Sequence, residues 1–191
     1  MAAETEKDDA RPSTPDLILD AAERVVAREG ARRLTIDAVV KESGFSKGGV
    51  LYNFPSKLDL IKGMVARMVT SFTEDHAAAM KQAEADGTSP LQGMVQALLR
   101  KKEDDMERQV SMGLLAAIAE NPELIDPIRD ALAAIREDLI AHAPDPVLAS
   151  VVLLAADGLH FSDILGLDVI GEDDRAAVEA RLLSLVSEPS R

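Results

Sequence analysis

Two lysines lie where a helix normally disfavours positive charge. Lys47 directly follows Ser46, and the same dipeptide recurs at Ser56-Lys57. Serine is among the preferred residues just before a helix begins. The helix dipole favours acids in the first turn, so each lysine there costs about 0.3–1 kcal/mol. A phosphate bound at these helix starts would reverse the sign, because the backbone N–H groups, the dipole and the ammonium group would all face one anion. The two lysines therefore predict a phosphate-bearing partner.

The sequence around the first of these lysines has the pattern of a helix-turn-helix. Thr35 is placed to cap a short helix over 36–43, and Gly44 is placed to end that helix in the left-handed conformation. Ser46 then caps a second short helix over 47–53. The side chains expected to face the interior recur at helical spacing and are Ile36, Val39, Val40, Phe45, Val50 and Phe54. This arrangement leaves one face of the second helix for a partner.

Two adjacent glycines inside the second helix support the same interpretation. Gly48 and Gly49 each cost about 1 kcal/mol relative to alanine, and close approach of the backbone to a partner would explain that cost. Tyr52 and Asn53 share the outward face. The residues predicted to contact nucleic acid, by positioning phosphates or reading bases, are Thr35, Ser46, Lys47, Gly48, Gly49, Tyr52, Asn53 and Lys57. The alternative is that these are surface residues that the fold tolerates and that bind nothing.

The charge distribution confines this predicted surface to the N-terminal third. The 191-residue chain has a formal net charge of −13, which by itself opposes binding to phosphates. Residues 11–65, however, contain nine basic and seven acidic side chains, whereas residues 66–191 contain eleven basic and 23 acidic side chains. The stretch from Ser43 to Leu58 includes both lysines and no acid. The acidity therefore belongs to the C-terminal two thirds of the chain.

The composition excludes several classes of chemistry. The chain has no cysteine, so disulfides, thiolate metal sites and cysteine nucleophiles are ruled out. No phosphate-binding Gly-Lys-Ser/Thr loop and no nucleophile-base constellation occur, so we expect no enzymatic activity and no cofactor. His76, Asp157 and His160 could hold a metal in principle, but without a second cluster we predict none. No apolar run approaches the roughly 18 residues of a membrane span, and the polar N-terminus is unlike a signal peptide. We therefore expect a soluble, cytoplasmic protein that binds no membrane.

Apolar residues recur at spacings of three and four without alternating strand patterns, which predicts an all-α chain. The nine predicted helices cover 15–29, 36–43, 47–53, 57–85, 90–102, 104–119, 127–142, 146–166 and 172–187. Five starts consist of a capping residue followed by proline, namely Thr14-Pro15, Ser89-Pro90, Asn121-Pro122, Asp126-Pro127 and Asp145-Pro146. Pro127 must interrupt the helix that Pro122 begins. The polar residues at the N-terminus are expected to be disordered.

From about Asp16 to Val65 the sequence resembles the TetR family of transcriptional regulators. The family has a first helix ending in glycine, a threonine-initiated second helix, a glycine-containing turn and a Ser-Lys opening of the fourth helix, which here correspond to Gly30, Thr35, Gly44 and Ser56-Lys57. The run from Gly44 to Lys57 is a specific signal. Many members have a second aromatic residue where this chain has Leu51, and a histidine where it has Asn53. Asn53 can still hydrogen-bond a phosphate or a base edge.

The resemblance implies a TetR-like architecture of nine helices. It divides the chain into a disordered tail (1–13), a three-helix helix-turn-helix domain that binds DNA (14–56) and a helical domain for ligand binding and dimerisation (57–191). It also implies a homodimer in which the last two helices form a four-helix bundle, and a ligand cavity in the larger domain. A shorter stretch, from Leu154 to Leu159, resembles a segment of family members that control drug efflux.

Dimerisation is also predicted from the last two helices themselves. They carry apolar residues on more than one face, and this apolar surface is larger than a monomer can bury against one domain. The predicted interface residues are Val151, Leu154, Leu165, Val178, Leu182 and Leu185. A two-fold dimer would place its recognition helices about 34 to 36 Å apart or somewhat more, which suits successive major grooves of a palindrome.

A methionine-rich row marks a candidate ligand pocket. Residues spaced by four along the fourth predicted helix are Met64, Met68, Phe72, His76 and Met80. The row drifts by about 40° per step, so it cannot lie on one flat core face, and methionine adapts well to ligands. Ordinary core is the alternative. Asp157, among apolar neighbours, could be hydrogen-bonded in the core, lie at a surface or interface, or be the counter-ion of a cationic ligand.

The predicted ligand-binding residues come from several helices and are Met64, Met68, Phe72, His76, Met94, Met112, Asp157, His160 and Phe161. Because only 3% of the residues are aromatic, a lipophilic aliphatic effector is favoured over an aromatic cage for flat cations. The sequence thus predicts a ligand-responsive regulator of double-stranded DNA, a repressor that a small lipophilic molecule releases from a palindromic operator. The alternative is an all-helical small-molecule, lipid or protein-interaction protein without DNA binding, which leaves Lys47 and Lys57 unexplained.

Overall fold

Nine α-helices form the computed structural model, which describes residues 12–101, 104–141 and 143–187. The helices are α1 (Thr14–Glu29), α2 (Ile36–Ser43), α3 (Lys47–Asn53), α4 (Lys57–Asp86), α5 (Pro90–Arg100), α6 (Asp105–Glu120), α7 (Asp126–Ala141), α8 (Pro146–Leu165) and α9 (Glu172–Ser187). Two short 3-10 helices are η1 (Ala31–Arg33) and η2 (Pro122–Ile125). The described residues contain no strand, so the all-α prediction is confirmed. The first eleven residues of the predicted tail lie outside the described part.

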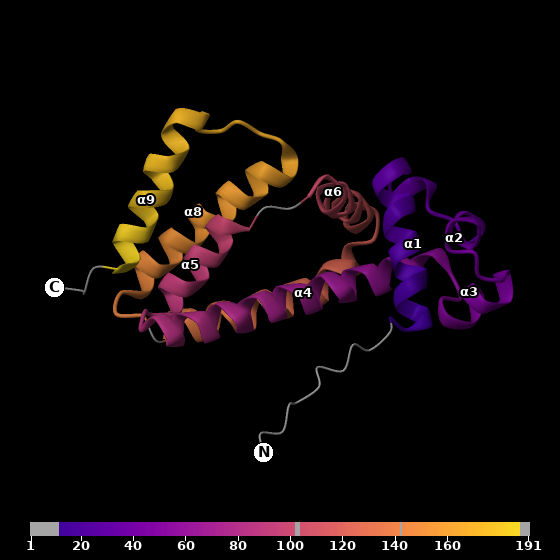
Figure 1. Cartoon of the computed structure of the whole chain (residues 1–191), viewed down its shortest axis with the longest axis horizontal. Coiled ribbons are helices and arrows are strands. Elements are labelled where there is room, and N and C mark those ends of the chain that lie inside the picture. Colours follow the sequence, from indigo (N-terminus) through magenta and orange to yellow (C-terminus); the bar gives the residue numbers. More distant parts are fainter. Residues whose placement is uncertain (1–11, 102–103, 142, 188–191) are drawn as a thin grey trace, which may run out of the picture.

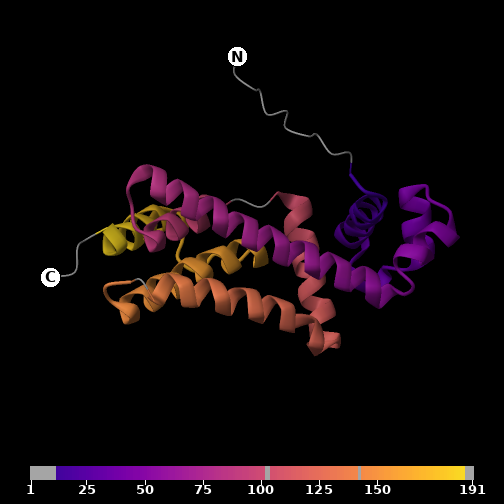
Figure 2. The same cartoon turned by 90° about the horizontal axis from the view of Figure 1, so that it is seen from below.

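The long helix α4 connects the two ends of the molecule (Figure 1). Its 30 residues begin beside α1, α2 and α3 and end beside α5. The last two helices, α8 and α9, pack against α5 at that far end. Turned by 90°, the molecule shows α7 running alongside α4 (Figure 2). The α1–α3 end and the larger helical domain are therefore joined by one continuous helix.

Two hydrophobic cores hold the helices together. The first includes Ile18 of α1, Val39 of α2, Val50 of α3, Met64 of α4 and Leu114 of α6, all nearly or fully buried. The helix-turn-helix is therefore completed by residues beyond position 56, the predicted domain boundary. The second core joins α5, α8 and α9 through Leu91, Val95, Ala149, Val152, Leu159 and Leu182. Helix α6 thus belongs to the core of the α1–α3 end while it also contacts α8.

Local capping explains most helix starts. The hydroxyl of Thr35 accepts the N–H of Ala38 at 3.1 Å, and Ser89 caps α5 in the same way. At α1, however, the cap is Ser13 and not Thr14. Ser13 accepts the N–H of Asp16 while the Asp16 carboxylate accepts the N–H of Ser13 at 3.2 Å, which makes a capping box. Ser13 therefore caps α1, and the predicted cap at Thr14 is wrong.

The predicted caps Asn121 and Asp126, which precede Pro122 and Pro127, are also wrong. Asn121 makes no capping bond to η2, because its side-chain amide instead donates to the carbonyl of Ala117 at 3.3 Å at the end of α6. Pro122 begins only the short η2, and Asp126 is itself the first residue of α7. The expected interruption at Pro127 is nevertheless present, since η2 ends just before α7 begins.

The prediction that no apolar stretch reaches the length of a membrane span is wrong for α8. Its 20 residues are long enough and apolar enough to cross a membrane by length and composition. The apolar side chains occupy two faces of the helix: Val152 and Ala156 are buried against other helices, whereas Val151 and Leu154 are exposed. The high apolar content thus combines a core face with a second apolar face at the surface.

Candidate DNA-binding surface and cavity

The start of α3 is open to a partner. The hydroxyl of Ser46 accepts the N–H of Gly49 at 3.1 Å, and the first turn contains no acid. A Cβ added at Gly48 would meet no atom within 4 Å, so packing inside the protein does not require this glycine. A Cβ at Gly49 would lie 3.3 Å from the Ser46 oxygen, which is tighter than ordinary contact. The absence of a side chain at Gly49 therefore leaves room for the capping hydroxyl of Ser46, and its absence at Gly48 leaves the backbone exposed.

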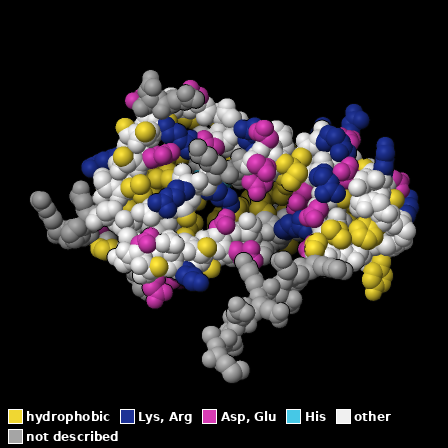
Figure 3. Space-filling model, in the orientation of Figure 1, with side chains coloured by type: hydrophobic (Ala, Val, Ile, Leu, Met, Phe, Trp, Pro, Cys, Tyr) yellow, Lys and Arg dark blue, Asp and Glu magenta, His cyan; other side chains and the backbone are white. Residues whose placement is uncertain are grey.

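Among the described residues, Lys47 makes one ion pair, which lies at the surface. Its Nζ lies 2.8 Å from Oδ1 of Asp37 in the first turn of α2, and both side chains are largely exposed. Exposed pairs of this kind contribute about 0–1 kcal/mol. A phosphate could replace the carboxylate at little cost. Figure 3 shows Lys and Arg side chains together with several acids at this end of the molecule.

Lys57 has an internal role that the sequence did not indicate. Its Nζ donates a hydrogen bond to the carbonyl oxygen of Arg32 at 3.0 Å, which ties the start of α4 to η1. In the same turn, Ser56 accepts the N–H of Asp59, whose acid complements the helix dipole. Lys57 therefore has a reason to be at a helix start without a phosphate, although the ammonium group has three donors and uses one here.

Tyr52 and Asn53 differ in their exposure and in their contacts within the chain. Tyr52 is 88% exposed, so its ring contributes little to the core and is available to a partner. Asn53 is half-buried, and its amide nitrogen donates to the carbonyl of Gly49 at 2.9 Å within α3. Only the amide oxygen of Asn53 keeps its full capacity for an external contact. The structure thus separates a projecting aromatic residue from a side chain that braces the helix.

Arg67 connects α4 to α1. Its Nη1 lies 2.6 Å from Oδ1 of Asp20 and 3.2 Å from Oε2 of Glu23, and its Nη2 donates to the carbonyl of Asp16 at 2.9 Å. Burial raises the pKa of Glu23, while the neighbouring Arg67 guanidinium acts in the opposite direction. Because one side chain holds three residues of α1, a shift of α4 at this point would also displace α1.

Helix α6 makes a second connection to the α1–α3 end. A Cβ added at Gly113 would lie 2.4 Å from Cγ1 of Val26, so only glycine allows the observed approach of α6 to α1. Further along, Nε of Arg32 lies 3.0 Å from Oε1 of Glu120. A displacement of α6 would therefore reach α1 and η1 directly.

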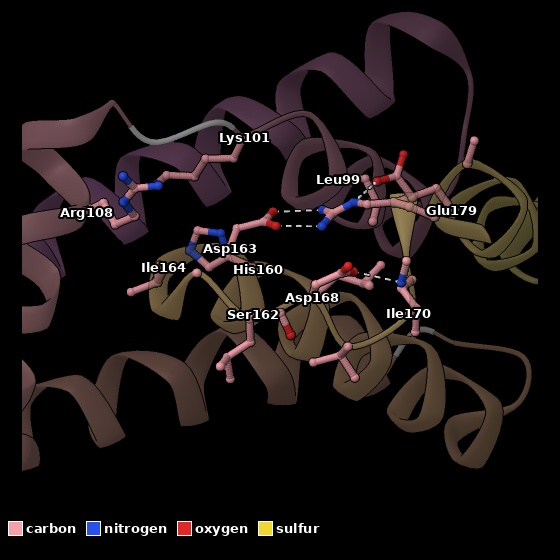
Figure 4. A pocket seen from close by; sticks show the side chains of 17 residues that line it. Leu99, Lys101, Arg108, His160, Ser162, Asp163, Ile164, Asp168, Ile170 and Glu179 are labelled. Carbon is pink, nitrogen blue, oxygen red and sulfur yellow. Dashed lines mark hydrogen bonds and ion pairs between the residues drawn. The ribbon is translucent and has the colours of Figure 1, made fainter. Parts of the chain in front are cut away.

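A cavity of about 1010 Å³ lies where α5, α6, α8 and α9 meet. Its walls come from the end of α5, the start of α6, the second half of α8, the 166–171 loop and the start of α9 (Figure 4). Arg175 of α9 holds two of these walls together, since its guanidinium binds both carboxylate oxygens of Asp163, one of them at 2.8 Å, and Glu179 at 2.8 Å. These hydrogen bonds raise the pKa of Arg175, which therefore remains charged.

Comparison with known proteins identifies the family. Residues 18–64 match the family model described as bacterial regulatory proteins, tetR family, and residues 88–187 match the model of the tetracyclin repressor-like C-terminal domain. The second match alone covers more than half of the chain. This protein belongs to the TetR family. The resemblance of the helix-turn-helix region to that family is therefore confirmed, and the larger helical domain belongs to it as well.

Individual relatives of this TetR-family protein are distant. The HTH-type transcriptional repressor BepR of Brucella suis is 25% identical over 131 residues, which cover 67% of this chain and 61% of that protein. The solved TetR-family member SCO1917 of Streptomyces coelicolor has a TM-score of 0.69 at 23% identity, over 90% of this chain and 98% of that one.

Two further solved structures share the fold and were determined with ligands. The multidrug binding protein EbrR complexed with ethidium has a TM-score of 0.66 at 22% identity, over 93% of this chain and all of that one. A protein of Saccharomonospora viridis in complex with choline has a TM-score of 0.67 at 20% identity, over 89% of this chain and 95% of that one.

In this TetR-family chain the predicted ligand-binding residues do not gather at one site. Of that set, only His160 lines the cavity. Met64 is 1% exposed and packs in the first core, and Met68 packs against the same core. The ring of Phe72 lies 5.6 Å from the Nζ of Lys101, which places it next to a cavity residue. The residues of the methionine row therefore face different surroundings along α4, as expected from the drift of the row around the helix.

The remaining members of that set lie elsewhere in the larger domain. His76 has its Nε2 3.6 Å from Oδ2 of Asp138 on α7. Met94 is half-buried on α5, whereas Met112 and Phe161 are exposed. Asp157 is also exposed on α8, although nearby protein atoms partly desolvate its carboxyl and raise its pKa. Among the described side chains, no three His, Asp or Glu residues group as metal ligands.

The predicted interface residues fall into two groups. Val151, Leu154 and Leu165 are exposed on α8. Val178 and Leu185 of α9 are half-buried and pack against the second core within the chain. Leu182 is 7% exposed in that core, against the expectation that it faces a partner. The helix α9 turns these side chains inward because α5 and α8 cover them.

The charged lining of the cavity was missed from the sequence. Lys101, Arg108 and Arg175 are separated by up to 74 positions and lie in the strongly acidic part of the chain. The only local signal was the spacing of Arg175 and Glu179 by four, which forms an ion pair on the helix. Nothing in the sequence pattern indicated that these residues share a cavity.

Proposed function

We propose that this TetR-family protein is a homodimeric transcriptional repressor that binds a palindromic DNA operator through α2 and α3 and leaves it when a small molecule binds the larger domain. The observation that carries the proposal is the open start of α3, where Lys47, Gly48 and Tyr52 face solvent in a chain that matches both family models. Such a regulator acts where the operator DNA is, in the bacterial cytoplasm.

The exposed groups divide into different roles by their chemistry in the free protein, and the strongest phosphate ligand among them is Lys47. Its ammonium group can exchange Asp37 for a phosphate. Thr35 and Ser46 use their oxygens as acceptors in helix caps, so their hydroxyl hydrogens stay available to a phosphate. Tyr52 is 88% exposed, so its hydroxyl and ring are free to contact a base or a phosphate. Lys57 positions η1 and supplies a second contact through its remaining donors.

The second apolar face of α8 supports dimerisation. Its exposed members recur at spacings of four, three, seven and four along the helix, and Leu154 near its centre is 72% exposed. Such a seam suits packing against the same helix of a second copy, because a two-fold axis pairs one surface with itself. The exposed side chains of this seam are Val147, Val151, Leu154, Phe161 and Leu165. A dimer joined there would hold two recognition helices at a fixed spacing.

Ligand binding must be coupled to DNA binding through a change in that spacing. A ligand lowers DNA affinity only if it binds the non-DNA-binding conformation more tightly, and a hundredfold effect requires about 2.7 kcal/mol of difference. Two connections can transmit the change: Arg67 from α4 to α1, and the contact of Gly113 on α6 with Val26. Both lie between the larger domain and the helix-turn-helix.

Fluorescence anisotropy with the DNA upstream of its own gene tests the proposal. Lys47→Met should weaken binding to specific and random duplex alike and lower the salt slope by about one unit. Tyr52→Ala should also weaken binding, and because the side chain is exposed the variant should fold normally. Lys81→Met, at an exposed lysine on α4, is the matched control and should bind like the parent.

Two outcomes would overturn this function. The parent protein could fail to bind any duplex at low salt, which is the behaviour expected of an acidic carrier or adaptor without DNA binding. Alternatively, Lys47→Met and Tyr52→Ala could both bind with the affinity and salt slope of the parent. The DNA contacts would then lie on another surface.

A further inference from the structure

The cavity beside α6 differs in character from the aliphatic pocket predicted along α4. It is larger than most single side-chain voids, at about 1010 Å³, and falls at the upper end of the size range of ligand sites. Figure 4 shows Lys101 and Arg108 at the opposite end of the cavity from Glu179. Its occupant is therefore selected by charged groups as well as by apolar ones.

The acids of the cavity wall are already occupied. Asp163 and Glu179 both bind the guanidinium of Arg175. Asp168 accepts the N–H of Gly171 at 2.8 Å, which fixes the loop between α8 and α9. These three carboxylates are committed to holding the walls together. Because Asp163 and Glu179 are paired with Arg175, they offer little to a positively charged ligand, whereas Asp168 keeps its negative charge in the loop.

The basic groups at the other end keep spare donors. Lys101 lies 2.6 Å from Asp75, and Arg108 lies 2.7 Å from Asp105, and neither of these acids lines the cavity. An ammonium group has three N–H donors and a guanidinium has five, so one ion pair leaves each side chain able to bind another anion. Both side chains are partly buried, which strengthens such a bond relative to one in open water.

The rest of the lining is apolar. Leu99 of α5, Leu159 and Ile164 of α8 and Ile170 of the following loop all contribute to the walls. An occupant that satisfies both parts has an apolar body and one negatively charged head. We infer that this cavity binds an amphipathic organic carboxylate, with the head between Lys101 and Arg108 and the body against the leucine and isoleucine side chains.

This inference rests on the proposed function, because it names the class of the effector. It also separates this chain from the relatives solved with ethidium and choline, which are cations. Arg108 and Gly113 are on the same helix, so a carboxylate that draws Arg108 into the cavity pulls on α6 where it touches α1. Occupation of the cavity is thereby connected to the DNA-binding end.

Calorimetry on the full-length protein with straight-chain carboxylates of six, eight and ten carbons, below their micelle concentrations, tests the inference. We expect at least one to bind, and the alcohol and the trimethylammonium of matching length to bind at least tenfold more weakly. Lys101→Met and Arg108→Met should each weaken carboxylate binding by about tenfold. Lys101→Arg should retain binding, and Lys81→Met on the outer surface of α4 should not change it.

The anisotropy assay on the same samples distinguishes this inference from the proposed function. If the parent protein does not bind DNA, the proposed function is refuted. If DNA binding is intact but no carboxylate binds, the inference is refuted. It is equally refuted if the trimethylammonium compound binds as tightly as the carboxylate, or if both methionine variants bind the carboxylate like the parent. Melting curves of the variants establish that each remains folded.

Discussion

The contact between α6 and α1 predicts that Gly113→Ala destabilises this protein, although alanine is the better helix former. The added Cβ would lie 2.4 Å from Cγ1 of Val26, whereas carbon atoms normally pack about 3.5–4.0 Å apart. Val26 is 1% exposed, so its branched side chain has no free space to turn into. The helix α6 would have to move away from α1 by about 1 Å.

Two opposing terms set the size of the effect. Overpacking of a close contact costs about 1–3 kcal/mol, and replacing glycine by alanine inside a helix returns about 1 kcal/mol. The net loss is about 1 kcal/mol, which lowers the melting temperature of a chain of this size by about 2–4 °C. Circular dichroism melts at one fixed protein concentration measure it, because dimerisation makes the melting temperature depend on concentration.

A double-mutant cycle makes the reasoning refutable. Val26→Ala removes the Cγ1 atom that the new Cβ would strike. In that background Gly113→Ala should no longer destabilise, so the two changes should deviate from additivity by about 1 kcal/mol or more. If Gly113→Ala raises the melting temperature of the parent, or if the two effects simply add, α6 does not depend on this close approach to α1.

Three further predictions concern other parts of the molecule. Gly48→Ala should stabilise the fold by about 1 kcal/mol, because its Cβ meets nothing within 4 Å, while weakening operator binding in the anisotropy assay; unchanged DNA affinity would remove the glycine from the interface. Leu154→Glu should convert the dimer to a folded monomer by light scattering, since the side chain is exposed in the single chain; an unchanged mass would exclude α8 as the seam. Arg24 and Arg28 hold the pKa of Glu42 below its ordinary value of 4.5, so this pairing stabilises the fold at neutral pH and the benefit disappears as the pH falls through the lowered pKa. The difference in urea midpoint between the parent and Glu42→Gln should therefore shrink in acid, and a difference that grows there would contradict the pairing.

Helix positions in this protein follow from sequence because the interactions that set them are local. A cap such as Ser46 acts on an N–H group three residues away, and Gly44 ends α2 with a φ of 76°. Apolar residues at spacings of three and four fix which side of each helix turns inward. The helix-turn-helix and the position of Lys47 at a capped start were therefore predicted correctly. The same local rules placed the cap of α1 at Thr14, one residue after the observed cap Ser13, because two adjacent hydroxyl residues compete for one cap.

Only the tertiary structure decided which side chains meet across the larger domain. Lys57 bonds the carbonyl of Arg32, 25 positions earlier, and no local pattern predicts that partner. Leu182 could equally have faced a second copy or its own core, because an apolar side chain gains from either burial. The cavity with Lys101 and Arg108 exists only because α5, α6, α8 and α9 are packed around it. Periodicity determines the face of a helix, whereas the identity of its neighbour depends on the packing of the whole chain.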